Sequence, residues 1–264
     1  MRSLARQNEA ELGGRLSVLA MQKRDHVELG RLLRRLESAA PREQPAVLLR
    51  MYRLVFPHAF AEESVLWPVI RRILPDGEVL TLQVEVEHQR INQMVTRLER
   101  LKPGSPEHRR LLPELVTLLR EDVRDEEDEL LPRLQSSLAP TQLRLLGLAW
   151  ELVRRIAPTR AHPIVSRRPP GNVLAALPLS LLDRSRDLVD GLRLARPGRG
   201  APVLDPLSRY LAGASHAVER GPGMRRGEDP ATRMAPGPRS PWRMAAAVTL
   251  GAALAAVLWK RQLR

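Results

Sequence analysis

The first 157 residues alternate between long stretches with a helical spacing of apolar residues and short breaks rich in proline and glycine. Leucine, valine and isoleucine recur every three or four positions, as on one face of an α-helix. Long helices joined by short connections pack as an antiparallel bundle. The pattern therefore predicts an all-α, up-down-up-down four-helix bundle followed by a short fifth helix. The predicted helices cover about residues 16–38, 45–74, 78–101, 106–138 and 142–156.

An internal repeat divides the predicted bundle into two halves. His26 and His88 are followed at the same offsets by apolar residues and by Arg-Leu-Glu. The segment 58–68 reads His-x3-Glu-Glu-x4-Pro, and the segment 122–132 has the same pattern with Asp in place of His. Two helical hairpins that carry the same polar residues should pair about a pseudo-twofold axis. Such a pairing suits a site for two metal ions rather than one.

Six polar side chains fall on the apolar, inward-facing stripes of the four long helices. Burying such side chains without a partner for their charge and polarity costs roughly several kcal/mol. Three are imidazoles and three are carboxylates, a ligand mixture that suits iron and also manganese. The pattern predicts that they bind a metal together. They are His26, His58, Glu62, His88, Asp122 and Glu126.

Other polar residues have less certain positions in this scheme. Glu63 and Glu127 lie one position away from the inward face, so they either support the ligands from behind or carry surface charge. His108, His162 and His216 lie outside the pattern and are expected to face solvent or the linker.

The sequence resembles the hemerythrin-like, or HHE, family. The resemblance rests on Asp25-His26, on the segment 58–68, on Glu87-His88 and on Glu126-Glu127 with Pro132, and covers about residues 16–136. It implies a four-helix bundle with a non-haem di-iron centre. It further implies that Glu62 and Glu126 bridge the metals, that His26 and His58 hold one metal, and that His88 holds the other. Members of the family bind dioxygen, or sense or handle oxygen, nitric oxide or iron.

The sequence departs from the family pattern at the second metal position. Asp122 stands where the fourth helix usually carries His, and Val84 and Asn92 stand where oxygen-carrying members have a further His. Glu85, one turn before His88, is a candidate substitute ligand. Carboxylates stabilise the higher oxidation state of a metal, so this centre is expected to consume or sense an oxidant rather than carry oxygen reversibly.

Composition narrows the chemistry further. The chain has no cysteine, which excludes disulfides, zinc–thiolate sites, iron–sulfur clusters and thiol nucleophiles. Its net charge of +13 favours contact with anionic surfaces. The arginines are scattered and few aromatic residues are available to stack on bases, which argues against nucleic acid as a partner.

The remaining residues differ in character from the bundle. Residues 158–241 are rich in proline, glycine and arginine and read as a flexible linker with short amphipathic helices at about 179–194 and 206–219. Residues 242–260 form a candidate transmembrane helix with tryptophan and basic residues at both ends. Its small residues Ala247, Gly251 and Ala255 lie four apart and offer a face for homodimer formation. Because the N-terminus has no apolar run, the bundle is expected in the cytoplasm, anchored to the membrane by the C-terminus.

These features together favour a membrane-tethered, metal-binding protein that senses or handles oxygen, nitric oxide, peroxide or iron. Two alternatives remain open. The same site would serve a di-iron oxidase or peroxidase-like enzyme, although a binding or sensor protein is favoured over an enzyme. The loss of His at position 122 also leaves room for a metal-free bundle that acts as a membrane-tethered interaction module.

Overall fold

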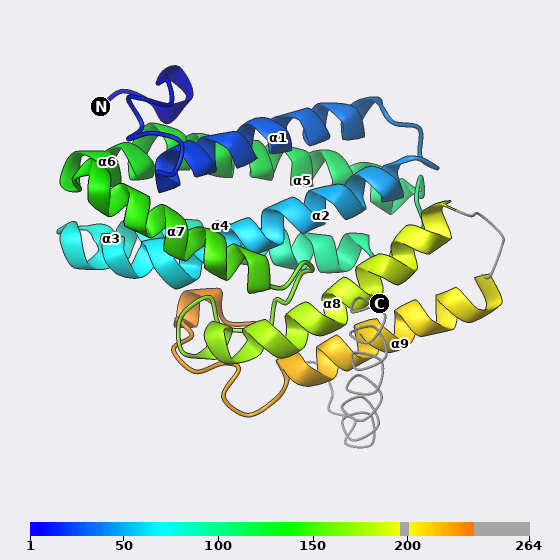
Figure 1. Ribbon diagram of the computed structural model, residues 1–264. Coiled ribbons are helices and arrows are strands. Elements are labelled where there is room, and N and C mark those ends of the chain that lie inside the picture. Colours follow the sequence, from blue (N-terminus) through cyan, green and yellow to red (C-terminus); the bar gives the residue numbers. More distant parts are fainter. Residues whose placement is uncertain (196–200, 235–264) are drawn as a thin grey trace, which may run out of the picture. The chain divides into compact units, whose positions relative to one another are not determined.

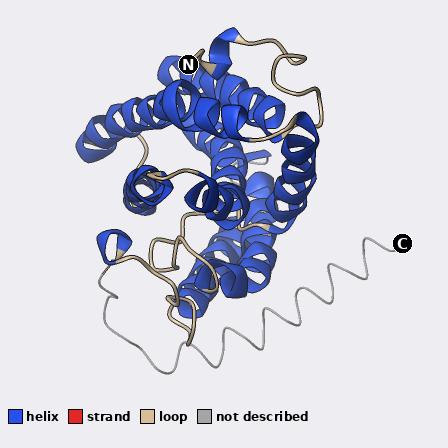
Figure 2. Cartoon of the chain, turned by 90° about the vertical axis from the view of Figure 1, so that its left-hand side faces the viewer, coloured by secondary structure: helices blue, strands red, loops and turns tan. Residues whose placement is uncertain are grey.

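The chain divides into two compact units, Met1–Ile156 and Ala157–Arg264. The computed structural model describes residues 1–195 and 201–234. Within these residues all regular elements are helices, as Figure 2 shows, which confirms the predicted all-α class.

The first unit is a bundle of antiparallel helices (Figure 1). Helix α1 packs against α2 and α5, α4 packs against α5, and α3 packs against α4. The predicted bundle is therefore confirmed. The helices are α1 (Val18–Ser38), α2 (Gln44–Ala61), α3 (Trp67–Ile73), α4 (Gly77–Leu98), α5 (Pro106–Asp125), α6 (Leu131–Ser137) and α7 (Pro140–Ile156), preceded by a 3-10 turn at Leu4–Arg6.

Serine caps set the start of two of the long helices. The Ser17 hydroxyl accepts a hydrogen bond from the Leu19 amide at the start of α1. The Ser105 hydroxyl accepts one from the His108 amide at the start of α5, where Pro106 occupies the first turn. A serine oxygen satisfies an amide that has no partner within the helix, and proline fits the first turn because it has no N–H to satisfy.

Two of the predicted long helices are each interrupted by one π-helical turn. Glu62–Leu66 separates α2 from α3, and Glu126–Leu130 separates α5 from α6. In the first turn the Trp67 amide donates to the Glu62 carbonyl, five residues earlier. The Leu131 amide does the same to the Glu126 carbonyl. The sequence analysis predicted continuous helices and missed both turns.

Proline explains where these π-turns form. Pro68 and Pro132 follow the two turns at equivalent positions of the repeat. Proline has no N–H, so neither residue can donate the ordinary α-helical hydrogen bond to the carbonyl four residues earlier. Each proline directly follows the residue whose amide closes the widened turn. Turns of this kind are frequent at functional sites.

One apolar cluster of the first unit lies around these two turns. Trp67 and Trp150 are its bulkiest members, at 0% and 1% exposure. Leucines from α1, α6 and the two π-turns fill the space around them. A rigid apolar layer of this density holds the flanking polar residues in fixed positions.

Helix α7 lies across α1 and α2 (Figure 1). Its approach is close at Gly147, where an added Cβ atom would lie 2.1 Å from the Leu16 carbonyl oxygen and 3.0 Å from the Val18 amide nitrogen. Only glycine allows the α7 backbone to pack this tightly against the segment that leads into α1.

The second unit differs from the flexible linker predicted for residues 158–241. Helices α8 (Gly171–Ala195) and α9 (Ala201–Glu219) pack against each other and are longer than the two short helices predicted. Small apolar clusters form around Leu179 and around Ala214. A 3-10 turn follows at Pro230–Thr232.

The predicted transmembrane helix at 242–260 lies outside the described residues, as do Ala247, Gly251 and Ala255. Among the helices of the described residues, none is both long and apolar enough to span a membrane.

Candidate metal centre

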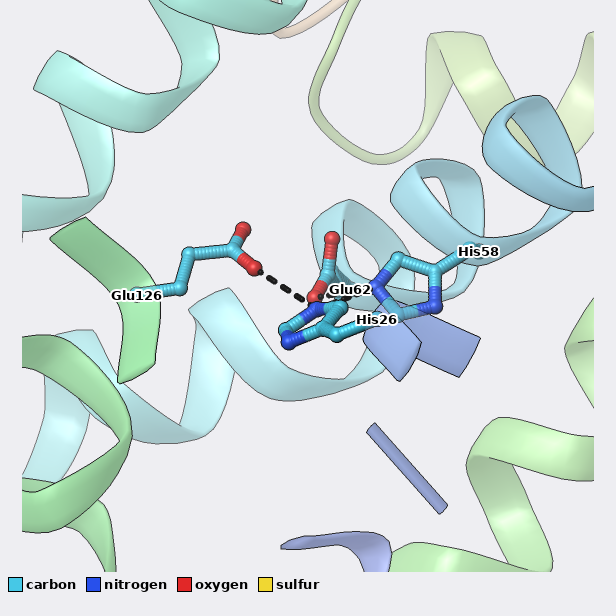
Figure 3. Close-up of side chains that lie close together, drawn as sticks. All are labelled: His26, His58, Glu62 and Glu126. Carbon is cyan, nitrogen blue, oxygen red and sulfur yellow. Dashed lines mark hydrogen bonds and ion pairs between the residues drawn. The ribbon is translucent and has the colours of Figure 1, made fainter. Parts of the chain in front are cut away.

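The structure brings all six predicted ligands together inside the first unit. They form two groups that share Glu126, and within each group the candidate ligand atoms all lie within 4.8 Å of one another. One group contains His26, His58, Glu62 and Glu126, and the other contains His88, Asp122 and Glu126. Glu126 and His58 point toward each other from opposite sides, with Glu62 and His26 between them (Figure 3).

Four helices deliver these side chains, as the periodicity predicted. His26 comes from the middle of α1 and His88 from the middle of α4. His58 and Asp122 lie near the ends of α2 and α5, and the two glutamates are the first residues of the π-turns that follow. The His-x3-Glu and Asp-x3-Glu spacings place each pair on one face, one turn apart.

Glu62 and Glu126 lie between the two halves of the repeat. Glu62 is 3.1 Å from His58 Nε2 through one oxygen and 3.8 Å from His88 Nε2 through the other. Glu126 is 3.3 Å from His26 Nε2 and 3.7 Å from His88 Nε2, again through different oxygens. Each carboxylate therefore reaches both groups.

Every histidine of the centre is held from behind by a carboxylate on its Nδ1 atom. His26 Nδ1 lies 3.0 Å from Glu127, and His58 Nδ1 lies 3.2 Å from Asp25. This arrangement suits imidazoles that carry their proton on Nδ1 and direct the Nε2 lone pair into the centre.

The third histidine follows the same rule. His88 Nδ1 lies 3.1 Å from Glu63, which is fully buried. Glu63 and Glu127 occupy the same repeat position, so each supports the histidine of the other hairpin. Of the two roles considered for these glutamates, the structure therefore places both behind the ligands.

Electrostatics favour protonation of the three imidazoles in the absence of metal. Burial opposes protonation of His26, but Glu126 and Glu127 outweigh it and raise its pKa to about 9. The pKa values of His58 and His88 are also raised well above the ordinary value, because nearby carboxylates again outweigh burial.

The pKa values of the carboxylates Glu126 and Asp122 are shifted in opposite directions. Burial raises the pKa of Glu126, yet its interactions with His26 and His88 prevail and lower it to about 2. Burial raises the pKa of Asp122 well above its usual range, and His88 only partly offsets this. Asp122 is therefore the carboxylate that most lacks positive charge.

The buried carboxylate oxygens fit a metal ion. Both oxygens of Glu62, Oδ1 of Asp122 and Oε1 of Glu126 are buried and make no hydrogen bond with the described residues. A buried anionic oxygen without a partner is costly, and a cation relieves that cost. Mixed imidazole and carboxylate donors suit iron and manganese, so the residues present fit the predicted metal.

A narrow pocket leads to the centre. Its volume of about 20 Å³ accommodates one water-sized molecule. Apolar side chains line its walls, among them Leu29, Phe56, Ile91 and Leu119, and the ligands form its floor. Asn92 also lines it and donates a hydrogen bond to the His88 carbonyl. The pocket admits small molecules only.

Other sequence expectations need correction. Glu85 is buried but forms an ion pair with Arg71 of α3, so it does not belong to either ligand group. His108 and His162, expected at solvent or the linker, are 2% and 5% exposed. His108 lies in the capped first turn of α5, and two carboxylates enclose His162 in the second unit.

Three residues that the sequence pattern did not single out touch the centre from outside. Asp25 appeared only as the neighbour of His26, and Trp150 and Arg154 of α7 were not singled out. Trp150 meets His58, and Arg154 meets Asp25. With only eight aromatic residues in the chain, an apolar-face tryptophan in the fifth helix was the available signal.

Comparison with known proteins agrees with this geometry. The family model described as the hemerythrin HHE cation binding domain matches residues 17–134. An uncharacterized hemerythrin-like protein of Schizosaccharomyces pombe is 25% identical over 134 residues, which cover 50% of this chain and 66% of that protein. A protein of Nostoc named DNA nickase is 25% identical over 119 residues, covering 45% of this chain and 33% of the relative.

The chain thus covers less than two thirds of the length of either relative. No solved structure shows a significant match. The matched segment contains all six residues of the centre and both π-turns. Residues 17–134 of the chain therefore belong to the hemerythrin-like HHE cation-binding domain family.

Proposed function

We propose that the first unit binds two metal ions, iron in the first place and manganese as the alternative, and uses them to sense or consume a small oxidant. The observation that carries the proposal is the pair of ligand groups that share Glu126 and meet across Glu62. A pair of iron ions supplies the electrons for such chemistry. The chain holds the ions and excludes other reactants.

The pocket defines the class of ligand. Room for one water-sized molecule admits dioxygen, nitric oxide or peroxide and excludes organic substrates of ordinary size. Apolar walls favour entry of uncharged molecules over ions. The buried floor keeps bulk water away from the ligands, which have at most 8% of their surface exposed.

The carboxylate-rich half favours consumption of the oxidant over reversible binding. Asp122 replaces an imidazole with an anionic donor, and anionic oxygen donors stabilise the higher oxidation state of iron. Stopped-flow mixing of the reduced, iron-loaded chain with oxygen should show oxidation that is not reversed when oxygen is removed. A stable, reversible oxygen complex would contradict this part of the proposal.

Metal content tests the proposal directly. The full chain purified from iron-supplemented cells should contain about two metal ions by elemental analysis, as its two ligand groups require. Glu62→Ala should remove most of them, because this carboxylate reaches both groups. A wild-type chain with much less than one metal ion would instead favour the metal-free interaction bundle.

Turnover separates a sensor from an enzyme. Repeated consumption of peroxide or ferrous iron by the loaded chain would identify an oxidase or peroxidase-like enzyme. A single round of oxidation per centre fits a sensor, whose signal is the changed state of the metal.

We further propose that the unit works in the cytoplasm beside a membrane, held by residues 242–260 and paired with a second copy through Ala247, Gly251 and Ala255. The support is the sequence of that segment alone. Fractionation of native cells should place the full chain with membranes and a chain ending at residue 241 in the soluble fraction.

A second candidate function is metal-dependent nicking of nucleic acid. A groove of about 540 Å³ on α1 and α2 is lined by Arg31, Arg35, Arg50 and Arg53, with Glu28 as its one acidic residue. It shares Leu54 with the pocket above the metal centre. Arginines in such a groove suit a phosphate backbone, and one relative is named a DNA nickase.

Supercoiled plasmid tests this candidate. The iron- or manganese-loaded chain should nick it, and Arg35→Gln with Arg50→Gln should weaken nicking more than Arg109→Gln with Arg110→Gln on α5. Nicking that persists after the metal is chelated, or none at all, would exclude the candidate.

A further inference from the structure

Helix α7 touches the metal centre although it lies beyond residues 17–134, the segment that the family model matches. Trp150 is its main contact. The indole is 1% exposed and meets the His58 imidazole edge-on, with ring centroids 5.3 Å apart and planes at 88°. A large side chain in this position restricts rotation of the imidazole, because interiors are packed without room for a different rotamer.

Arg154 contacts the Asp25 carboxylate, which in turn contacts His58. Its Nη1 atom lies 3.4 Å from Asp25 Oδ2, and the same oxygen lies 3.2 Å from His58 Nδ1. The result is a chain of contacts that leads from the ligand through Asp25 to α7.

Two further contacts fix Arg154 itself. Its guanidinium lies over the Trp150 ring at 5.2 Å, and its Nη2 atom lies 2.7 Å from Glu151. The close approach of the α7 backbone at Gly147 keeps the whole helix in register with the start of α1. Trp150 and Glu151 therefore both hold the guanidinium that meets Asp25.

The contacts serve only one half of the pseudo-symmetric centre. In the other half Trp67 stacks on His88 at 6.4 Å, but this tryptophan belongs to the repeat itself. The repeat counterpart of Asp25 is Glu87, and that of His58 is Asp122. The repeat therefore does not reproduce the contacts of Arg154, Asp25 and His58 at the matching positions, where Glu87 and Asp122 stand.

We propose that Trp150 and Arg154 are positioning residues that set the orientation and donor strength of His58, so that α7 is energetically part of the His26–His58 metal position. This inference rests on the proposed metal binding. Residues behind a ligand fix its tautomer and orientation, and their loss costs roughly 10- to 100-fold in metal affinity. Because coupling is reciprocal, occupation of this position by metal must in turn stabilise α7.

Chelator competition on the full chain tests the affinity. Arg154→Gln should weaken one of the two bound metals by about 10-fold and leave the other unchanged. Arg154→Lys retains a cation near Asp25 and should recover part of the loss. Arg155→Gln is the matched control, because Arg155 is the next residue of the same helix and also pairs with Glu151.

The visible spectrum of the cobalt(II)-loaded chain separates a positioning role from general stability. Trp150→Phe and Arg154→Gln should change the cobalt absorption, which reports ligand geometry, while Arg155→Gln should not. Thermal unfolding of each apoprotein checks that the variants fold. Trp150→Phe keeps an aromatic ring in the core and so provides a variant that folds if Arg154→Gln does not.

Hydrogen exchange tests the reciprocal effect. Metal should slow amide exchange in α7 of the wild-type chain and do so less in Arg154→Gln. A wild-type chain that binds two metals, with Arg154→Gln and Trp150→Phe unchanged in affinity and spectrum, would overturn this inference alone. A wild-type chain that binds no metal would overturn the proposed function and this inference together.

Discussion

The contact between His26 and His58 shows how the centre works at the scale of single residues. Their Nε2 atoms lie 3.2 Å apart, and each ring is held by a carboxylate on the opposite nitrogen. Two lone pairs cannot face each other at that distance without a cation between or beside them. A proton or a metal ion must satisfy them, and the two compete for the same nitrogen atoms.

Proton release on metal binding follows from this competition. His26 has a pKa of about 9, and those of His58 and His88 are also raised, so the apoprotein carries protons on these rings at pH 7. Metal must displace them. Its affinity should therefore rise with pH from 7 towards 9 and fall steeply below 7.

A pH indicator in weakly buffered solution measures the released protons directly when ferrous iron is added under anaerobic conditions. Glu62→Ala, which should bind little metal, provides the baseline. Metal binding without proton uptake or release, and with an affinity independent of pH over this range, would contradict the prediction.

Asp122 is the residue at which the two halves of the repeat differ most. Asp122→His should strengthen the second metal position, because it restores an imidazole at the place that His58 occupies in the first half. Glu87 is the repeat counterpart of Asp25 and already acts on Asp122 through its charge. The new ring should meet Glu87 as His58 meets Asp25.

Metal release into a chelator should accordingly slow for one of the two metals in Asp122→His. Glu121→His adds a histidine on the exposed side of the same helix and controls for unspecific binding. Equal release from both variants would show that the aspartate is already an adequate ligand.

The sequence predicted that the six ligand residues meet at one centre, but of the residues behind them it offered only Glu63 and Glu127, as one of two alternatives. Periodicity assigns His26 or Glu62 to the inward face, and the repeat shows that such residues meet. Neither the periodicity nor the repeat shows which side chain lies behind a given imidazole ring. Asp25 and Arg154 are 129 positions apart, and their pairing depends on how α7 crosses α1.

At the scale of elements, the two π-turns position the glutamates of the centre. Each begins with a shared glutamate and continues with the glutamate that supports a histidine of the other hairpin. A continuous α-helix would separate neighbouring residues by about 100° around its axis. The wider turn is the local geometry in which Glu62 and Glu63 both reach ring nitrogens.

Pro68→Ala tests whether the proline maintains its π-turn. Alanine restores the N–H that an ordinary α-helix uses and favours helix by up to about 3 kcal/mol over proline in a helix interior. The variant should melt at the same or a higher temperature, yet bind metal more weakly because Glu63 turns away from His88.

Pro113→Ala is the matched control, since Pro113 lies inside α5 away from either π-turn. It should affect thermal unfolding alone. Unchanged metal affinity in Pro68→Ala would show that packing around Trp67, rather than the proline, maintains the turn.

At the scale of the whole molecule, the second unit shows why a packed segment can resemble a linker in sequence. Its interior is largely polar: Arg160 is 6% exposed and pairs with Asp187 and Asp190 at 2.8 and 2.9 Å. Periodicity analysis looks for apolar stripes and discounts buried ion pairs. The many prolines and glycines also favoured the prediction of a flexible linker. The charged residues spaced along 160–190 were the available sign of a packed interior.

The buried ion pairs make the second unit's stability depend on pH. His162 lies 2.9 Å from both Asp183 and Glu219. Burial opposes its charge, but these carboxylates prevail and raise its pKa to about 10, above the usual 6.5. The stabilisation is complete below pH 6.5 and is lost as pH rises through 10.

Glu219 sets the acid limit. Burial raises its pKa, but His162 and His216 prevail and lower it to about 2, below the usual 4.5. Its contribution is complete above pH 4.5 and is lost as pH falls through 2. The second unit should therefore be most stable between about pH 4.5 and 6.5 and weaken on both sides.

Hydrogen exchange resolved by peptide measures the pH dependence of stability in α8 and α9. It separates these helices from the first unit, whose own histidines also titrate. The protection of α8 and α9, corrected for the intrinsic exchange rate, should decline from pH 6 to pH 9 in the wild-type chain. His162→Gln should start lower and lose that decline, because glutamine has no charge to lose. His108→Gln, in the first unit, should leave both helices unaffected. An equal decline in wild type and His162→Gln would assign the alkaline loss to another group and would show that the pairing of His162 with Asp183 and Glu219 does not hold the unit together.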